Sequence, residues 1–156
     1  MPALPWSEGL VLGLSFMDDT HKEFVDLLAR CEGSTDAQLP VLWNELIAHT
    51  DDHFGREEEW MLATGFAAGN CHATQHKVVL QVLREGAAMA RQGELAPIRQ
   101  MIRELAAWFP QHAQTMDAAL ALHLRGVGYD AATGEVRHPD ALPLEEISGC
   151  GGASCS

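Results

Sequence analysis

Hydrophobic positions recur with helical spacing along four stretches of the chain, and short connections containing glycine separate these stretches. Ser15 or Asp18 can cap the first expected helix, and Pro40 suits the first turn of the second. No segment shows the period-2 alternation of a β-strand. The expected helices run from near Asp18 through HKEFVDLLAR, from about Gln38 to Ala63, from Gly69–Asn70 to Gly93, and from about Pro97 to Leu124.

Four helices with short connections predict an all-α fold, an antiparallel up-down-up-down four-helix bundle. We expect this bundle to occupy residues 1–125. Residues 126–156 are rich in Gly, Pro and Ser and lack an apolar period, so we expect an extended tail there. The last eight residues, GCGGASCS, are expected to be flexible.

The length and charge of the chain restrict its function. A chain of 156 residues fits one domain with a real core. Its net charge of -12 argues against nucleic acid and against an anionic membrane as partners. No apolar run approaches the roughly 20 residues that span a bilayer, and the start has no leader-like pattern. We therefore expect a cytoplasmic protein whose four cysteines are mostly reduced.

Histidines and carboxylates occur at metal-ligand spacing on the expected helices. His53 and Glu57 are four residues apart, so both point to one helix face, and His72 and His76 have the same spacing. Such a pair alone is usually an ordinary surface pair. With one histidine on the first helix and a His/Asp pair on the fourth, the pattern predicts a metal site in the bundle core. The candidate ligands are His21, His53, Glu57, His72, His76, His112 and Asp117.

Two metal ions explain five imidazoles and two carboxylates better than one ion, which seven ligands would crowd. Imidazole suits Fe, Zn, Cu and Ni rather than Ca or Mg. Two carboxylates can each bridge both ions, and the imidazoles then divide three and two. With one bridging oxygen from solvent, one ion reaches six ligands and the other five. The vacant position is where a small ligand would bind.

The segments MDDTHKEF, HFGREEEWM, HATQH and WFPQHAQTMD resemble the ligand segments of hemerythrins, particularly the bacterial ones. The resemblance runs from about Trp6 to Leu124. It implies two iron ions with a bridging oxo or hydroxo group and no haem. It also implies that His21 and His53 hold the open iron, that Glu57 and Asp117 bridge, and that the remaining three histidines hold the closed iron. The implied lining of the oxygen pocket is Phe24, Phe54, Trp108, Phe109 and Ala113.

The function implied by this resemblance is reversible dioxygen binding for storage, delivery or scavenging, and not enzymatic turnover. Dioxygen is then the ligand, with an oxygen-consuming enzyme or a reductase as a further partner. Three alternatives stay open: a di-iron enzyme that reduces peroxide or nitric oxide, an oxygen or redox sensor module, and a structural bundle loaded with zinc or manganese.

The fourth expected helix departs from regular spacing. His112 and Asp117 are five residues apart, about 140° of rotation on a regular helix. Pro110 removes a backbone donor just before them. We therefore expect a kink or a local widening near residues 106–117. Ala113, where the family has a bulkier residue, predicts a roomier oxygen pocket and faster autoxidation.

Other polar residues have less specific interpretations. His49 is either a neighbour of the site or an exposed residue, and of the run Glu57–Glu59 only Glu57 is expected in the site. Cys71 is expected to be a small buried residue. Cys150 and Cys155 are either inert tail thiols or a redox or metal-handling pair.

Overall fold

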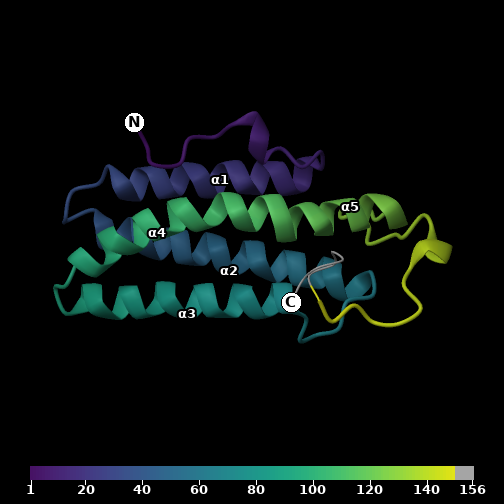
Figure 1. The fold of residues 1–156 in the computed structure, drawn as a ribbon. Helices are drawn as coiled ribbons and strands as arrows, with labels where there is room; N and C mark the ends of the chain where they lie inside the picture. The colour runs from purple at the N-terminus through teal and green to yellow at the C-terminus, as the bar shows by residue number, and fades with distance from the viewer. Residues whose placement is uncertain (150–156) are drawn as a thin grey trace.

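The structure is a computed structural model that describes residues 1–149, and within them the fold is all-helical (Figure 1). The long helices run antiparallel to their neighbours, as the sequence predicts. Their bounds are α1 Ser15–Glu32, α2 Leu39–Ala63, α3 Cys71–Arg91, α4 Ala96–His112 and α5 Ala118–Val127. A π-helical segment, Ala113–Asp117, joins α4 to α5, so these three pieces form the fourth helix of the bundle. None of these helices is both long and apolar enough to cross a bilayer.

Local interactions explain where the helices start. The helix α1 begins three residues before the expected Asp18, and its N-cap is Leu14 without a side-chain cap. The Asp18 carboxylate instead accepts the backbone N–H groups of Leu12 and Gly13, at 2.8 and 3.1 Å, and so fixes the chain that leads into the helix. The Asn70 side chain caps α3 by accepting the Ala73 N–H at 2.9 Å.

Two apolar layers fill the bundle. Where a helix passes from one layer to the other, most of its buried residues are polar. One layer contains Phe24, Leu46, Phe109 and Ala113, and the other contains Met17, Trp60, Met61 and Leu120. Leu62 follows the buried Trp60 and Met61 but is 56% exposed, so it does not belong to either layer. The polar residues between the two layers are shielded from water on both sides.

Residues 128–149 lie against one end of the bundle and include no strand, only two isolated bridges. The backbone of Ile147 pairs with Gly65 and Ala67, each at 2.9 Å, in the connection between α2 and α3. Gly65 has φ 103°, and a Cβ there would come within 2.4 Å of Pro143, so the tail approaches this connection closely. The expected flexibility of GCGGASCS concerns residues that lie almost entirely outside the described range.

Candidate metal centre

Each helix of the bundle places its candidate ligands on its inner face. His53 and Glu57 on α2, and His72 and His76 on α3, are one turn apart, so each pair projects to the same side. His21 on α1 is also fully buried. All of these side chains lie in the polar region between the two apolar layers, where no bulk water reaches them.

A local widening of the fourth helix brings His112 and Asp117 to the same face, although they are five residues apart. Pro110 lies inside α4, and the π-helical segment follows directly after His112 and ends at Asp117. Because hydrogen bonds in a π-helix join residues five apart, one turn of it aligns His112 with Asp117. Both residues are buried, at 3% and 0% exposure. The expected local widening is thereby confirmed.

The candidate ligands meet as two groups that share their carboxylates. One group contains Glu57, Asp117 and three histidines, and the other contains the same two carboxylates and two histidines. Within each group the candidate donor atoms lie within 4.8 Å of one another. The histidines of the larger group are His72, His76 and His112, and those of the smaller are His21 and His53. The resemblance to hemerythrins implies the same division of the five histidines.

The donor atoms face a common interior without satisfying one another. Nitrogen–oxygen distances in the cluster range from 2.8 Å, for His53 and Glu57, to 3.7 Å, for His21 and Glu57. Most of these contacts lack hydrogen-bond geometry, and buried polar atoms without partners are unfavourable. The cluster atoms that are buried and unpartnered are Nε2 of His21, His72, His76 and His112, Nδ1 of His21, His53 and His72, Oε1 of Glu57, and both carboxylate oxygens of Asp117. Imidazole nitrogen and carboxylate oxygen together fit iron or a similar transition metal.

The two buried carboxylates are anionic in the metal-free protein. Burial and the mutual repulsion of the two groups raise the pKa of Glu57, but His53 and His21 outweigh both, so this pKa lies well below its ordinary value. Burial likewise raises the pKa of Asp117, and His112, His21 and His72 bring it well below its ordinary value. Glu57 and Asp117 therefore carry two negative charges in a buried site, and these charges require compensating cations.

Protons supply part of this compensation when no metal is bound. Burial lowers the pKa of His21, but the nearby carboxylates of Asp117 and Glu57, 3.1 and 3.7 Å from its Nε2, outweigh burial and raise this pKa to about 10. His76 is similar: burial lowers its pKa, and Glu57 and Glu58 raise it to about 9. For His53 burial dominates, and its pKa is lowered. A metal that binds here must displace protons from these imidazoles.

Two residues that sequence reasoning did not identify contact the outer nitrogens of ligand candidates. Glu58 Oε2 lies 3.3 Å from His76 Nδ1, and Gln75 Oε1 lies 2.6 Å from His112 Nδ1. The Glu58 side chain is 39% exposed, so its carboxylate contacts both solvent and the His76 ring. Acceptors at this position orient a ligand imidazole and increase its basicity. The spacing of residues within α2 or α3 does not predict either contact, because each contact joins two different helices.

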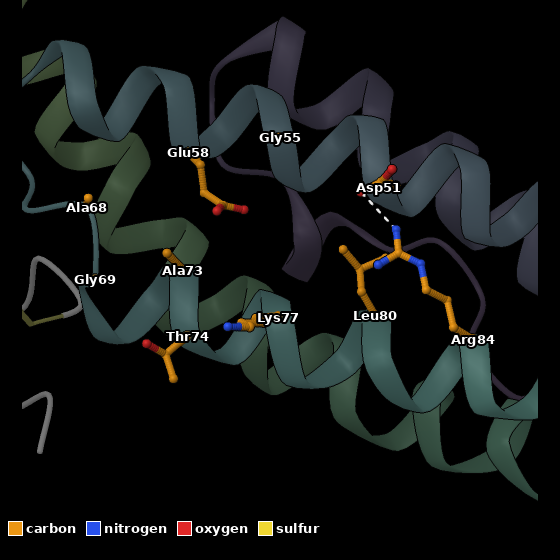
Figure 2. A pocket seen from close by; sticks show the side chains of 10 residues that line it. All are labelled: Asp51, Gly55, Glu58, Ala68, Gly69, Ala73, Thr74, Lys77, Leu80 and Arg84. Carbon is orange, nitrogen blue, oxygen red and sulfur yellow. Dashed lines mark ion pairs between the residues drawn. The ribbon is translucent and has the colours of Figure 1, made fainter.

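Glu58 also lines a surface pocket of about 460 Å³ between α2 and α3 (Figure 2). In that view Glu58 extends from α2 toward α3, above Ala73. An ion pair of 3.3 Å between Asp51 and Arg84 lies at the other end. Solvent can therefore approach the outer side of Glu58 while its inner side contacts His76.

The five residues expected to line an oxygen pocket lie beside the cluster. Phe24 stacks on Phe109 with centroids 4.7 Å apart, and Phe109 meets the edge of the His21 ring at 5.2 Å. On the other side, rings cover the histidines of the larger group: Phe54 lies 3.8 Å from His76, and Trp108 lies 4.5 Å from His112. Ala113 is fully buried.

His49, Cys31 and Cys71 lie outside the cluster. His49 Nε2 lies 3.0 Å from Glu23 Oε2, and its ring is 6.1 Å from that of His53. Cys31 is a free buried thiol. Cys71 is disulfide-bonded, which corrects the expectation of a reduced thiol there. Cys71 starts α3, where its N–H donates to Ser148 O at 3.1 Å. The two tail cysteines lie outside the described residues.

Comparison with known proteins shows which family this chain resembles. Residues 12–123 match the family model described as Hemerythrin HHE cation binding domain, and this span contains all seven cluster residues. The chain is 37% identical over 131 residues to a Bacteriohemerythrin of Ralstonia nicotianae, covering 84% of this chain and 96% of that protein.

More distant relatives carry the same description. A Bacteriohemerythrin of Stenotrophomonas maltophilia is 26% identical and aligns with 78% of this chain and 81% of its own length. One of Pseudomonas aeruginosa is 26% identical, with 60% of this chain and 64% of that protein aligned. No solved structure matches the chain significantly.

Proposed function

The chain belongs to the hemerythrin family, and from this premise we propose that it binds dioxygen reversibly at a non-haem di-iron centre. The observation that carries the proposal is the division of the buried donors into two groups that share Glu57 and Asp117. Paired metal ions in proteins lie roughly 3.5–4 Å apart, a separation that a shared carboxylate can bridge. Two buried anions and five imidazoles also suit iron better than Mg or Ca.

In this proposal the two metal positions are unequal. His72, His76 and His112 would hold one iron, His21 and His53 would hold the other, and both irons would share Glu57 and Asp117. An oxo or hydroxo group from solvent would complete the centre. When bound, the iron pair supplies the electrons that dioxygen accepts. The position with two imidazoles has one protein donor fewer, so the vacancy for a small ligand lies beside His21 and His53.

The surroundings of the cluster favour carrying dioxygen over consuming it. Phe24, Phe54, Trp108, Phe109 and Ala113 form an apolar wall, which admits an apolar gas and excludes water. Most of the donors are neutral imidazoles when they ligate, so the site stabilises high-valent iron less than a carboxylate-rich site does. In this proposal the protein therefore stores, delivers or scavenges dioxygen, and an oxygen-consuming enzyme or a reductase is its partner.

The proposal is tested by purifying the full chain in air and measuring its iron content, its optical spectrum and its response to argon. We expect about two irons per chain and charge-transfer bands that bleach on reduction and return on exposure to dioxygen. Zinc or manganese in place of iron, or one metal per chain, would overturn the proposal. Sustained consumption of peroxide or nitric oxide with an added reductant, without reversible oxygenation, would replace it with an enzymatic function.

A further inference from the structure

Thr50 lies in the layer beside the metal position with two histidines. The helices α1 and α2 are antiparallel, and the rings of His21 and His53 lie 5.1 Å apart across their interface. Three residues forward from His21 is Phe24, and three residues back from His53 is Thr50, so these two lie at the same level. Phe24 stacks on Phe109, which contacts the His21 ring. Thr50 therefore faces the aromatic layer next to the proposed vacancy.

The hydroxyl of Thr50 is buried and has no hydrogen-bond partner among residues 1–149. Thr50 is 0% exposed, and its Oγ1 makes no hydrogen bond with any described residue. Threonine in a helix normally donates to the carbonyl four residues earlier. Four others in this chain do so at 2.6–3.0 Å: Thr20 to Phe16, Thr64 to Trp60, Thr74 to Asn70, and Thr115 to Gln111. Thr50 differs from all of these.

The other unpartnered buried atoms of the described chain have explanations that Thr50 lacks. Most belong to the seven cluster residues, where a metal or its surroundings account for them. His49 has an unpartnered Nδ1, but its Nε2 contacts Glu23 at 3.0 Å. Arg56 Nε lies 3.1 Å from Asp52. Thr50 is left as a buried hydroxyl without a hydrogen-bond partner in the described chain, and such a group is unfavourable unless something else supplies the hydrogen bond.

We propose that the Thr50 hydroxyl donates a hydrogen bond to the small ligand that occupies the vacant position beside His21 and His53. This inference rests on the proposed function, because it requires the di-iron centre. A hydroxyl in a dry aromatic layer favours ligands that carry negative charge when bound, since a hydrogen bond to a charged acceptor is stronger than one to a neutral acceptor. Thr50 thus selects small anionic ligands, and dioxygen as it accepts electrons, over ligands that accept no hydrogen bond.

Azide binding to the oxidised, iron-loaded protein tests the proposal, because azide is a small anion with a spectroscopic readout. Thr50→Val keeps the branched shape and removes the hydroxyl, and we expect about tenfold weaker azide binding. Thr50→Ser keeps the hydroxyl and should bind azide within about twofold of wild type. The matched control is Thr20→Val, because Thr20 is also a buried helical threonine but already donates to Phe16 O. Its azide affinity should not change.

The metal-free protein gives a second readout that does not depend on iron. Removing an unpartnered hydroxyl should raise the melting temperature of Thr50→Val by about 3 °C, whereas Thr20→Val should lower it. Unchanged azide affinity in a Thr50→Val protein that holds two irons would overturn the role of Thr50 and leave the proposed function intact. A wild-type chain that holds no iron pair would overturn both. A lower melting temperature for metal-free Thr50→Val would show that the hydroxyl is satisfied within the protein, which also overturns the proposal.

Discussion

Glu58 Oε2 lies 3.3 Å from His76 Nδ1, and within residues 1–149 it is the only carboxylate that contacts the outer nitrogen of a cluster imidazole. Gln75 makes the corresponding contact with His112 through a neutral amide oxygen. Both outer partners serve the group with three imidazoles. In the described chain the Nδ1 atoms of the other three have no hydrogen-bond partner: His21, His53 and His72. The two proposed iron positions therefore differ in electron density as well as in donor number.

Glu58→Gln should weaken iron binding by about 10- to 100-fold and raise the midpoint potential of the centre. The carboxylate makes His76 a stronger donor, and a stronger donor stabilises ferric iron, so its loss favours the ferrous state. Chelator competition measures the affinity, and potentiometric titration measures the potential. Glu59→Gln is the matched control, because it removes the same charge one residue further along α2. Equal effects of both substitutions would show that Glu58 acts only through its negative charge and not through its contact with His76.

The fourth helix shows how far spacing alone can predict structure. A spacing of five residues from His112 to Asp117 is incompatible with one face of a regular α-helix, so the sequence already requires an irregular helix there. Pro110 suggested that the irregularity has its origin at the proline. The structure instead accommodates Pro110 within α4 and places the widening after His112. The position of a π-helical segment depends on packing between helices, which a single sequence does not display.

Contacts between helices explain the residues that sequence reasoning missed. Glu58 lies in a run of three glutamates that resembles an ordinary solvated face, and Gln75 resembles any polar residue on a helix surface. Their roles depend on which imidazole faces them from a neighbouring helix. The pairs His53/Glu57 and His72/His76 could be placed on one helix face because their spacing is encoded within each helix, whereas the prediction of the full set also used the resemblance to hemerythrins. The outer contacts could not be predicted, because no single helix encodes them.

Asp117→Asn should reduce the iron content from about two to below about one per chain, with the helical circular-dichroism spectrum retained. Asp117 belongs to both donor groups, so the neutral amide would weaken both metal positions at once. Elemental analysis after loading under argon checks this. Glu59→Gln should keep the full iron content. Two tightly held irons in Asp117→Asn would show that Asp117 does not bridge.

Two helical glycines should respond in opposite directions to alanine. A Cβ at Gly55 meets nothing within 4 Å, so Gly55→Ala should stabilise the protein by about 0.5–1 kcal/mol through helix propensity. A Cβ at Gly86 would come within 2.8 Å of Met101 Sδ and 3.2 Å of Trp43 Nε1. Trp43 is fixed by its hydrogen bond to Leu83 O, so Gly86→Ala should destabilise by about 1–3 kcal/mol. Urea denaturation of both variants measures the two free energies, and stabilisation by Gly86→Ala would contradict this packing.

Ala113→Ile should slow the oxidation of the reduced, iron-loaded protein in air. Ala113 is fully buried at the first position of the π-helical segment, and we expect a larger side chain there to reduce the access of water or an anion to the metal centre. The added methylenes should also destabilise the fold by about 1–3 kcal/mol. The oxidation rate is followed optically after reduction under argon and exposure to air. Equal rates in wild type and Ala113→Ile would contradict a protective role for side-chain volume at this position.

The metal-free protein should lose stability as the pH rises from about 6.5 toward 10. His21 and His76 have folded-state pKa values of about 10 and about 9, above the ordinary value of 6.5. Their contribution to stability is therefore fully present below about pH 6.5 and is lost as the pH rises through these values. His53 has a lowered pKa, so its contribution to stability changes only below about pH 6.5 and does not offset the alkaline decline.

Acid should also destabilise the metal-free protein, because Glu57 and Asp117 have lowered pKa values. Their contribution is present above the ordinary values of 4.5 and 3.8 and is lost as the pH falls below them. Melting temperatures across this range should therefore be highest between about pH 4.5 and 6.5. Ferrous iron added under argon should bind more tightly as the pH rises, because it displaces imidazole protons, and should remove the alkaline decline. A metal-free protein whose stability increases steadily from pH 6.5 to 9 would show that the carboxylates do not hold protons on these imidazoles.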